Sequence, residues 1–170
     1  MAGDGAGHSG ADPVDPQDAA LRAVIGPFAE TPGALLPVLH AVQAAFGHID
    51  DAAVVVIADQ LNLSRADVHG VLTFYHDFRR KPAGASVLKI CRAEACQAMG
   101  ADALIAHAEA RLETPMHSVR ADGAISLEPV YCLGLCSAAP SAMLDGQVFA
   151  RLSPARLDGL LAGALARALA

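Results

Sequence analysis

Apolar residues recur at helical spacing through the first half of the chain. Within each segment they lie three or four positions apart, so that they share one face of a helix. Asp50 or Asp51 is expected to cap the third of these helices, and Ser64 with Asp67 has the form of a capping box for the fourth. Helices are predicted over residues 16–25, 33–46, 51–61 and 65–78. Together they would make a small helical bundle.

The spacing of apolar residues changes in the second half of the chain. The short apolar run 86–90 predicts a strand, and the Ala- and Leu-rich stretch 95–112 predicts a helix. Asp122-Gly123 and Asp145-Gly146 each lie between short apolar runs and predict hairpin turns. Ser153-Pro154 supplies the cap and first-turn proline of a last helix. The expected order is β-α-β-β-β-β-α, and the whole chain is expected to be α+β with helices against a sheet.

These patterns divide the chain into domains. Residues 1–15 hold scattered Gly, Pro and Asp with little apolar periodicity, and they are expected to form a flexible tail. Residues 16–80 are expected to form the helical bundle domain. Residues 81–85, with a Pro and a Gly, are the expected linker to a second domain at residues 86–170.

Composition and charge exclude several classes of function. The 170 residues are 54% hydrophobic and 18% charged, which allows one moderate core or two small ones. A formal net charge of −6 opposes nucleic-acid binding, which needs a concentrated basic face. The longest apolar stretches, 52–58 and 160–170, are too short or interrupted to cross a bilayer, so no membrane span is expected. Residues 1–20 lack the basic and apolar segments of a secretory signal, and a cytoplasmic location is expected.

All four cysteines fall into two close pairs, Cys91 with Cys96 and Cys132 with Cys136. Thiolates are soft ligands that suit zinc or the iron of iron–sulfur clusters, so these four can enclose one metal centre. Paired zinc cysteines most often have two residues between them, whereas a C-x4-C step also occurs in plant-type two-iron ferredoxins. The spacing favours a [2Fe-2S] cluster and leaves a structural zinc-binding interaction module as the alternative.

Two other uses of the cysteines fit less well. Disulfides need an oxidising compartment, and the beginning of the chain gives no sign of export. A thiol redox motif normally has two residues between its cysteines, and neither pair has that spacing.

Small residues lie within both pairs, among them Ala93, Ala95 and Gly134. They leave room for backbone N–H groups to approach the sulfurs of a cluster, although Gly134 is almost equally expected from a tight turn alone.

Phe74 and Tyr75 end the fourth predicted helix. In a chain with five Phe, two Tyr and no Trp they are expected to lie in the core, with a partner surface as the alternative. A lone helical His such as His40 is expected to have a structural role.

Several motifs occur in an order that resembles a known family. They are Leu36–Gln43, Phe46-Gly47, Thr73-Phe74-Tyr75, Cys91-x4-Cys96, Asp122-Gly123, and Cys132-Leu133-Gly134-x-Cys136 followed by Ala139-Pro140. Over residues 16–152 the chain is similar to the thioredoxin-like [2Fe-2S] subunits. These include the 24-kDa-type subunit of NADH:quinone oxidoreductase, its equivalent in NAD-linked hydrogenases, and the gamma subunit of NAD-dependent formate dehydrogenase. The resemblance implies a helical domain followed by a thioredoxin-like ferredoxin domain, with Cys91, Cys96, Cys132 and Cys136 as cluster ligands.

The resemblance also implies a non-catalytic role as an electron-transfer subunit. The stretch 128–136 is most similar to the formate dehydrogenase branch, with the quinone-linked and hydrogenase complexes as alternatives. FMN and NAD would be bound by a neighbouring subunit, and a larger iron–sulfur subunit that contains molybdenum would complete the complex. The sequence of this chain is consistent with a non-catalytic role. No Gly-rich dinucleotide loop follows a predicted strand, and no catalytic constellation stands out.

Overall fold

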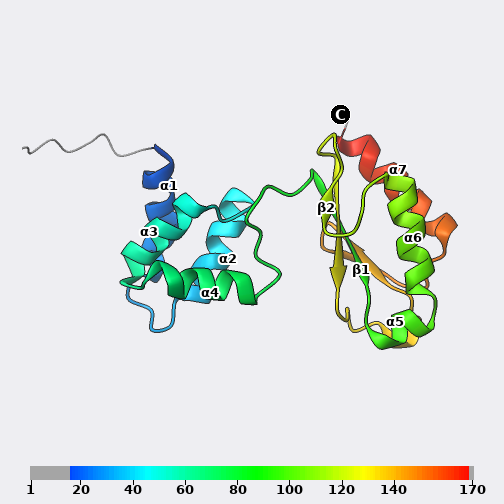
Figure 1. Ribbon diagram of the computed structural model, residues 1–170, viewed down its shortest axis with the longest axis horizontal. Coiled ribbons are helices and arrows are strands. Elements are labelled where there is room, and N and C mark those ends of the chain that lie inside the picture. Colours follow the sequence, from blue (N-terminus) through cyan, green and yellow to red (C-terminus); the bar gives the residue numbers. More distant parts are fainter. Residues whose placement is uncertain (1–15, 169–170) are drawn as a thin grey trace, which may run out of the picture. The chain divides into compact units, whose positions relative to one another are not determined.

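A computed structural model of the chain describes residues 16–168, so the expected tail at residues 1–15 lies outside the described residues. The chain separates between Pro82 and Ala83 into two compact units (Figure 1). The first unit is helical, and the second combines helices with a five-stranded sheet. The α+β class is therefore confirmed. Within residues 16–168, each helix falls short of the length and apolarity that a bilayer crossing requires.

The helical unit contains the four predicted helices. They are α1 (Pro16–Ile25), α2 (Leu35–Phe46), α3 (Asp51–Leu61) and α4 (Arg65–Phe74), with a short 3-10 turn, η1 (Gly26–Phe28), after α1. Asp50 caps α3 by accepting a hydrogen bond of 2.8 Å from the Ala53 N–H. Ser64 and Asp67 form the expected capping box of α4. Helix α1 packs against α2 and α3, and α3 against α4.

Helix α4 ends earlier than predicted. It was expected to continue to Phe78, but Tyr75 has an extended backbone (φ −94°, ψ 104°) and the chain turns back. The amide of Gln43 explains this, because it donates to the Asp77 carbonyl (2.8 Å) and accepts from the Arg79 N–H (2.6 Å). Phe78 is thereby buried. The expectation that Phe74 and Tyr75 lie in the core is wrong, since they are 73% and 43% exposed.

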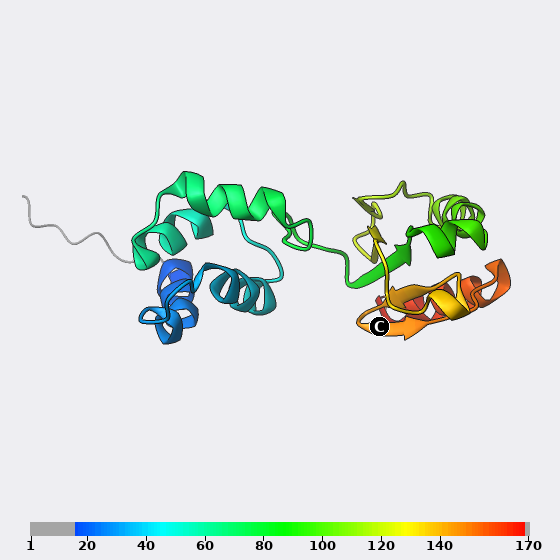
Figure 2. The ribbon, with the colours of Figure 1, turned by 90° about the horizontal axis from the view of Figure 1, so that it is seen from below.

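The second unit is built on a mixed sheet. Its elements are β1 (Ser86–Cys91), α5 (Glu94–Ala98), α6 (Ala101–Leu112), β2 (Ser118–Val119), β3 (Ile125–Val130), η2 (Cys136–Ala138), β4 (Ala142–Leu144), β5 (Gln147–Phe149) and α7 (Pro154–Ala168). The strand order is β2-β3-β1-β4-β5. Helices α6 and α7 pack against each other and against the sheet, as both views show (Figures 1 and 2).

The helix predicted over residues 95–112 is divided in two. Gly100 has a left-handed backbone (φ 89°), which ends α5 and lets α6 begin at Ala101 in a new direction. The order is therefore β-α-α-β-β-β-β-α. Both Asp-Gly turns lie where they were expected, between β2 and β3 and between β4 and β5.

Strand β1 is central because it pairs with β3 in parallel and with β4 antiparallel. In the parallel register Cys91, the last residue of β1, lies beside Val130, the last residue of β3. Parallel strands end at the same edge of a sheet. The loops that follow β1 and β3 therefore begin side by side.

Gly84 gives a test of this packing. It lies in the expected linker, yet its N–H donates to the Ser126 hydroxyl (2.7 Å), and a Cβ at this position would lie 2.6 Å from the Ile125 carbonyl carbon. Because backbone cannot move aside cheaply, we expect Gly84→Ala to lower the free energy of unfolding of the second unit by about 1–3 kcal/mol. Gly159→Ala is the control, since a Cβ there meets nothing within 4 Å. Thermal or urea unfolding should show the control to be about 1 kcal/mol more stable; equal effects of the two substitutions would contradict the packing.

Candidate metal centre

The four cysteines gather at the sheet edge where β1 and β3 end. Cys91 is the last residue of β1, and Cys96 lies on α5 in the loop that follows. Cys132 comes two residues after β3, and Cys136 begins η2. The first two cysteines are each 2% exposed, whereas the other two are exposed. The sequence-predicted site residues thus lie together, with one pair covered by protein and one pair facing outward.

The sulfurs approach one another as pairs. The Sγ atoms of Cys132 and Cys136 are 3.8 Å apart. Two sulfurs bound to one tetrahedral metal at about 2.3 Å are separated by about the same distance. Cys91 and Cys96 belong to one buried cluster. Across residues 16–168, no three His, Cys, Asp or Glu side chains converge on one point as ligands of a single metal ion.

A backbone N–H group points at one of these sulfurs, since the Cys132 sulfur accepts a hydrogen bond of 3.4 Å from Gly134. The backbone of Ala93, Cys132 and Leu133 lies near enough to the Cys91 thiol to lower its pKa. Cys132 (φ 88°) and Gly134 (φ 77°) both have positive φ, and such a backbone turns successive N–H groups towards one side. For Cys132, a non-glycine residue, this conformation is strained, which is common at functional sites.

The thiols perturb each other electrostatically. Burial raises the pKa of Cys91, but the hydrogen bonds from Ala93, Cys96, Cys132 and Leu133 outweigh it, and the net pKa lies below the ordinary value. The pKa of Cys136 is raised, first by its hydrogen bond with Cys132 and then by the charge of the neighbouring sulfurs. A metal cation bound to these sulfurs would stabilise their thiolate forms.

The surroundings fit a two-iron cluster. Ala101 and Ala139 are small residues that pack against the buried cysteines. The hydroxyl of Ser141, a buried residue, lies 3.6 Å from the Cys96 sulfur. Nothing in the sequence pointed to Ser141, because the pairing of β1 with β4 brings it there. At Gly134 a Cβ would meet no atom within 4 Å, so the positive φ alone accounts for the glycine in this structure.

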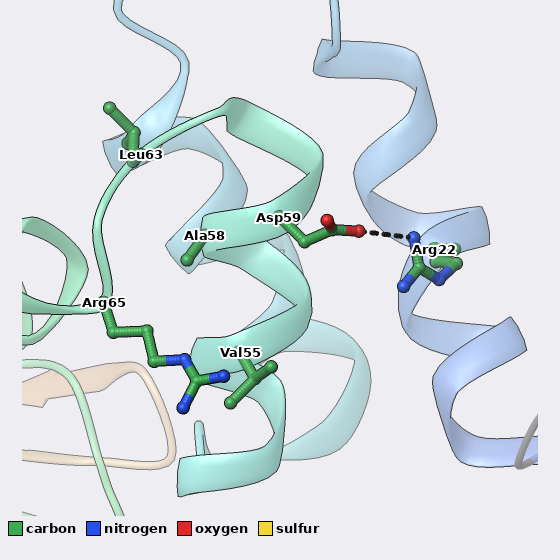
Figure 3. A pocket seen from close by; sticks show the side chains of 6 residues that line it. All are labelled: Arg22, Val55, Ala58, Asp59, Leu63 and Arg65. Carbon is green, nitrogen blue, oxygen red and sulfur yellow. Dashed lines mark hydrogen bonds and ion pairs between the residues drawn. The ribbon is translucent and has the colours of Figure 1, made fainter.

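A pocket of about 450 Å³ lies on the helical unit (Figure 3). Its lining residues are Arg22, Val55, Ala58, Asp59, Leu63 and Arg65. Arg22 donates to Asp59 at 3.0 Å, and Arg65 points along the same face of α3 (Figure 3). The pocket contains none of the predicted site residues. The ring of His40 lies beside that of Phe78, with centroids 4.9 Å apart, and its structural role stays a prediction.

Comparison with known proteins identifies relatives that match about three quarters of this chain. The thioredoxin-like [2Fe-2S] ferredoxin family matches residues 21–164. One relative, a component of the NADH-quinone oxidoreductase of Mycobacterium tuberculosis H37Rv, is 32% identical over 133 residues, which are 78% of this chain and 53% of that protein. The corresponding NADH-quinone oxidoreductase component of Escherichia coli K12 is 34% identical over 128 residues (75% and 77%). The HndA component of the NADP-reducing hydrogenase of Solidesulfovibrio fructosivorans is 31% identical over 130 residues (76% and 76%).

Solved structures give the same result for the fold. The air-oxidised NAD+-reducing [NiFe]-hydrogenase matches with a TM-score of 0.69 and 25% identity, over 79% of this chain and 23% of that chain. Its H2-reduced state gives 0.68 and 26%. The chain spans about half the length of the mycobacterial relatives and less than a quarter of the hydrogenase chain.

The contact of Ser141 with Cys96 gives a prediction for protein that carries the cluster of this family. A hydroxyl that donates to a ligand sulfur stabilises the more negative, reduced state. We expect Ser141→Ala to lower the midpoint potential by roughly tens of millivolts. Redox titration followed by EPR measures the shift, and Ser141→Thr, which keeps a hydroxyl, is the control. An unchanged or raised potential in the Ala variant would show that the hydroxyl does not donate to this sulfur.

Proposed function

We propose, from the premise that this chain belongs to the thioredoxin-like [2Fe-2S] ferredoxin family, that it is a one-electron carrier within an NAD-linked oxidoreductase complex. The single observation that supports this most is the meeting of two cysteine pairs at the sheet edge where β1 and β3 end, with the Gly134 N–H donating to the Cys132 sulfur. A [2Fe-2S] cluster supplies one-electron acceptor chemistry when bound, usually at low potential with four thiolate ligands.

We assign the ligands by pairs. Cys91 and Cys96 would hold one iron, and Cys132 and Cys136 the other. The N–H groups of Ala93, Cys132 and Leu133 would offset the negative charge on the Cys91 sulfur, and burial keeps water from the first pair. The exposed second pair leaves a short path for electrons to a partner.

The redox partner of this chain would be a neighbouring subunit that binds FMN and NAD. The names of the relatives support this, since NADH-quinone oxidoreductase and NADP-reducing hydrogenase both act on nicotinamide nucleotides. The chain's role would be to accept single electrons from the flavin, in the cytoplasm, without a substrate site of its own.

Within this class we propose the NAD-dependent formate dehydrogenase complex, in which a larger iron–sulfur subunit contains molybdenum. The residues that support it are 128–136, around the second cysteine pair. The second candidate is the equivalent subunit of a quinone-linked NADH dehydrogenase or an NAD-reducing hydrogenase, which the relatives and the hydrogenase structures favour.

Metal content tests the assignment of the cluster. Protein purified without oxygen should contain about two irons per chain and give an EPR signal after reduction with dithionite. Cys96→Ser should lose most of the iron and the signal, because a buried ligand is removed. Ser137→Ala, an exposed change in the second loop, should leave both unchanged. Colourless protein that contains zinc and shows no EPR signal would establish the zinc module instead.

The partners test the choice of complex. When the tagged chain is purified with its native assembly, we expect FMN and molybdenum to co-purify and the preparation to reduce NAD+ with formate. Metal analysis and this assay give the answer together. Nickel, or NADH oxidation coupled to quinone without molybdenum, would replace formate dehydrogenase by the second candidate.

A further inference from the structure

Charged residues are scarce in the two loops that hold the cysteines. Residues 91–96 and 131–140 contain one cation, Arg92, and one anion, Glu94. Arg92 directly follows Cys91, so its guanidinium group lies within about the length of one arginine side chain from that cysteine. Where so few charges surround a redox centre, each one has a large effect on the free energy of adding an electron.

The side chain of Arg92 is half-buried and has no partner of its own. Its Nε is a buried atom that forms no hydrogen bond within residues 16–168, and its guanidinium group takes part in no ion pair there. Native proteins satisfy nearly all buried polar groups, and an exception calls for an explanation such as a bound group. Negative charge held by the four cysteines would be a counter-charge that the rest of the chain does not supply.

The backbone fixes Arg92 between the two loops. Its N–H donates to the carbonyl of Val130 (2.8 Å), the residue that pairs with Cys91 in the parallel register. The N–H of Cys91 donates to the carbonyl of Ser141 (3.0 Å). These hydrogen bonds involve main-chain atoms, so we expect a substitution of the Arg92 side chain to leave the loop in place.

Other charged groups near this edge of the sheet are less favourably placed. Lys89 and Glu128 form a cross-strand ion pair of 3.8 Å and largely neutralise each other. Arg151 adjoins the second loop, because its N–H donates to the Ala138 carbonyl (2.7 Å), but its side chain is exposed. The side chain of Glu94 is exposed as well. Water and salt screen exposed charges much more than half-buried ones.

We propose that the half-buried charge of Arg92 raises the reduction potential of the two-iron centre and makes the chain a better acceptor of single electrons. This inference rests on the proposed function, because it requires the cluster. A centre with four thiolate ligands becomes more negative when it gains an electron, so a nearby cation stabilises its reduced state more than its oxidised state. Arg92 acts here through its electric field and needs no contact with sulfur or iron.

Redox titration of the cluster-loaded full chain, followed by EPR, measures this effect. Arg92→Gln should make reduction about tenfold less favourable, a fall in midpoint potential of about 59 mV for one electron. The fall should largely persist at ~1 M salt, since a half-buried charge is poorly screened. Arg92→Lys, which keeps the charge, should restore most of the potential.

Arg151→Gln is the matched control, because it makes the same chemical change at an exposed cation beside the second loop. It should change the equilibrium of reduction by less than about twofold, and by less still at ~1 M salt. Circular dichroism and iron content check that each variant is folded and loaded. Arg92→Met, a second neutral variant, replaces Arg92→Gln in the comparison if the Gln variant loses its iron.

The outcomes distinguish a failure of the inference from a failure of the proposed function. If wild type gives the two-iron EPR signal and the loaded neutral variant stays within about twofold of it, or has a higher potential, the inference is wrong and the proposed function stands. The same holds if the Lys variant is as low as the neutral one, if Arg151→Gln has an equal effect, or if both neutral variants lose their iron. If wild type binds no two-iron cluster, the proposed function is wrong and the inference fails with it.

Discussion

The parallel pairing of β1 with β3 is the constraint on which the rest of the structure depends. It places Cys91 beside Val130, so that both cysteine loops leave the sheet at one edge. A shift of one residue in register would turn Cys91 to the opposite face, and a shift of two would move it about 7 Å along the strand. Either change would move its sulfur away from the backbone of Cys132 and Leu133, which now lowers the pKa of the Cys91 thiol. The register of β1 against β3 therefore determines whether the two cysteine loops meet.

The site is built to hold negative charge. One sulfur pair is buried and receives several backbone N–H groups, and the other is exposed. This asymmetry suits a carrier that must both stabilise an added electron and pass it to a neighbour. The helical unit contains none of this chemistry, yet it exposes Phe74, the most exposed large hydrophobic side chain within residues 16–168.

Local signals in the sequence predicted most elements, and contacts between distant residues account for the differences. Caps such as Asp50 and turns such as Asp122-Gly123 depend on neighbouring residues, and both were found where expected. The early end of α4 depends on Gln43, which is more than thirty residues away in the sequence. The contact of Ser141 with Cys96 likewise depends on the sheet order. The cysteine pairs were visible because their spacing is local, whereas the exposure of Phe74 depends on where the chain turns.

Iron X-ray absorption of the purified protein tests the two-iron assignment most directly, because it reports the atoms around the metal. We expect iron surrounded by sulfur alone, with a second iron as the nearest neighbour beyond it, since two cysteines and shared sulfides complete each iron. A spectrum without iron–iron scattering, or zinc as the only metal bound to the four sulfurs, would contradict the assignment of Cys91, Cys96, Cys132 and Cys136 to one two-iron centre.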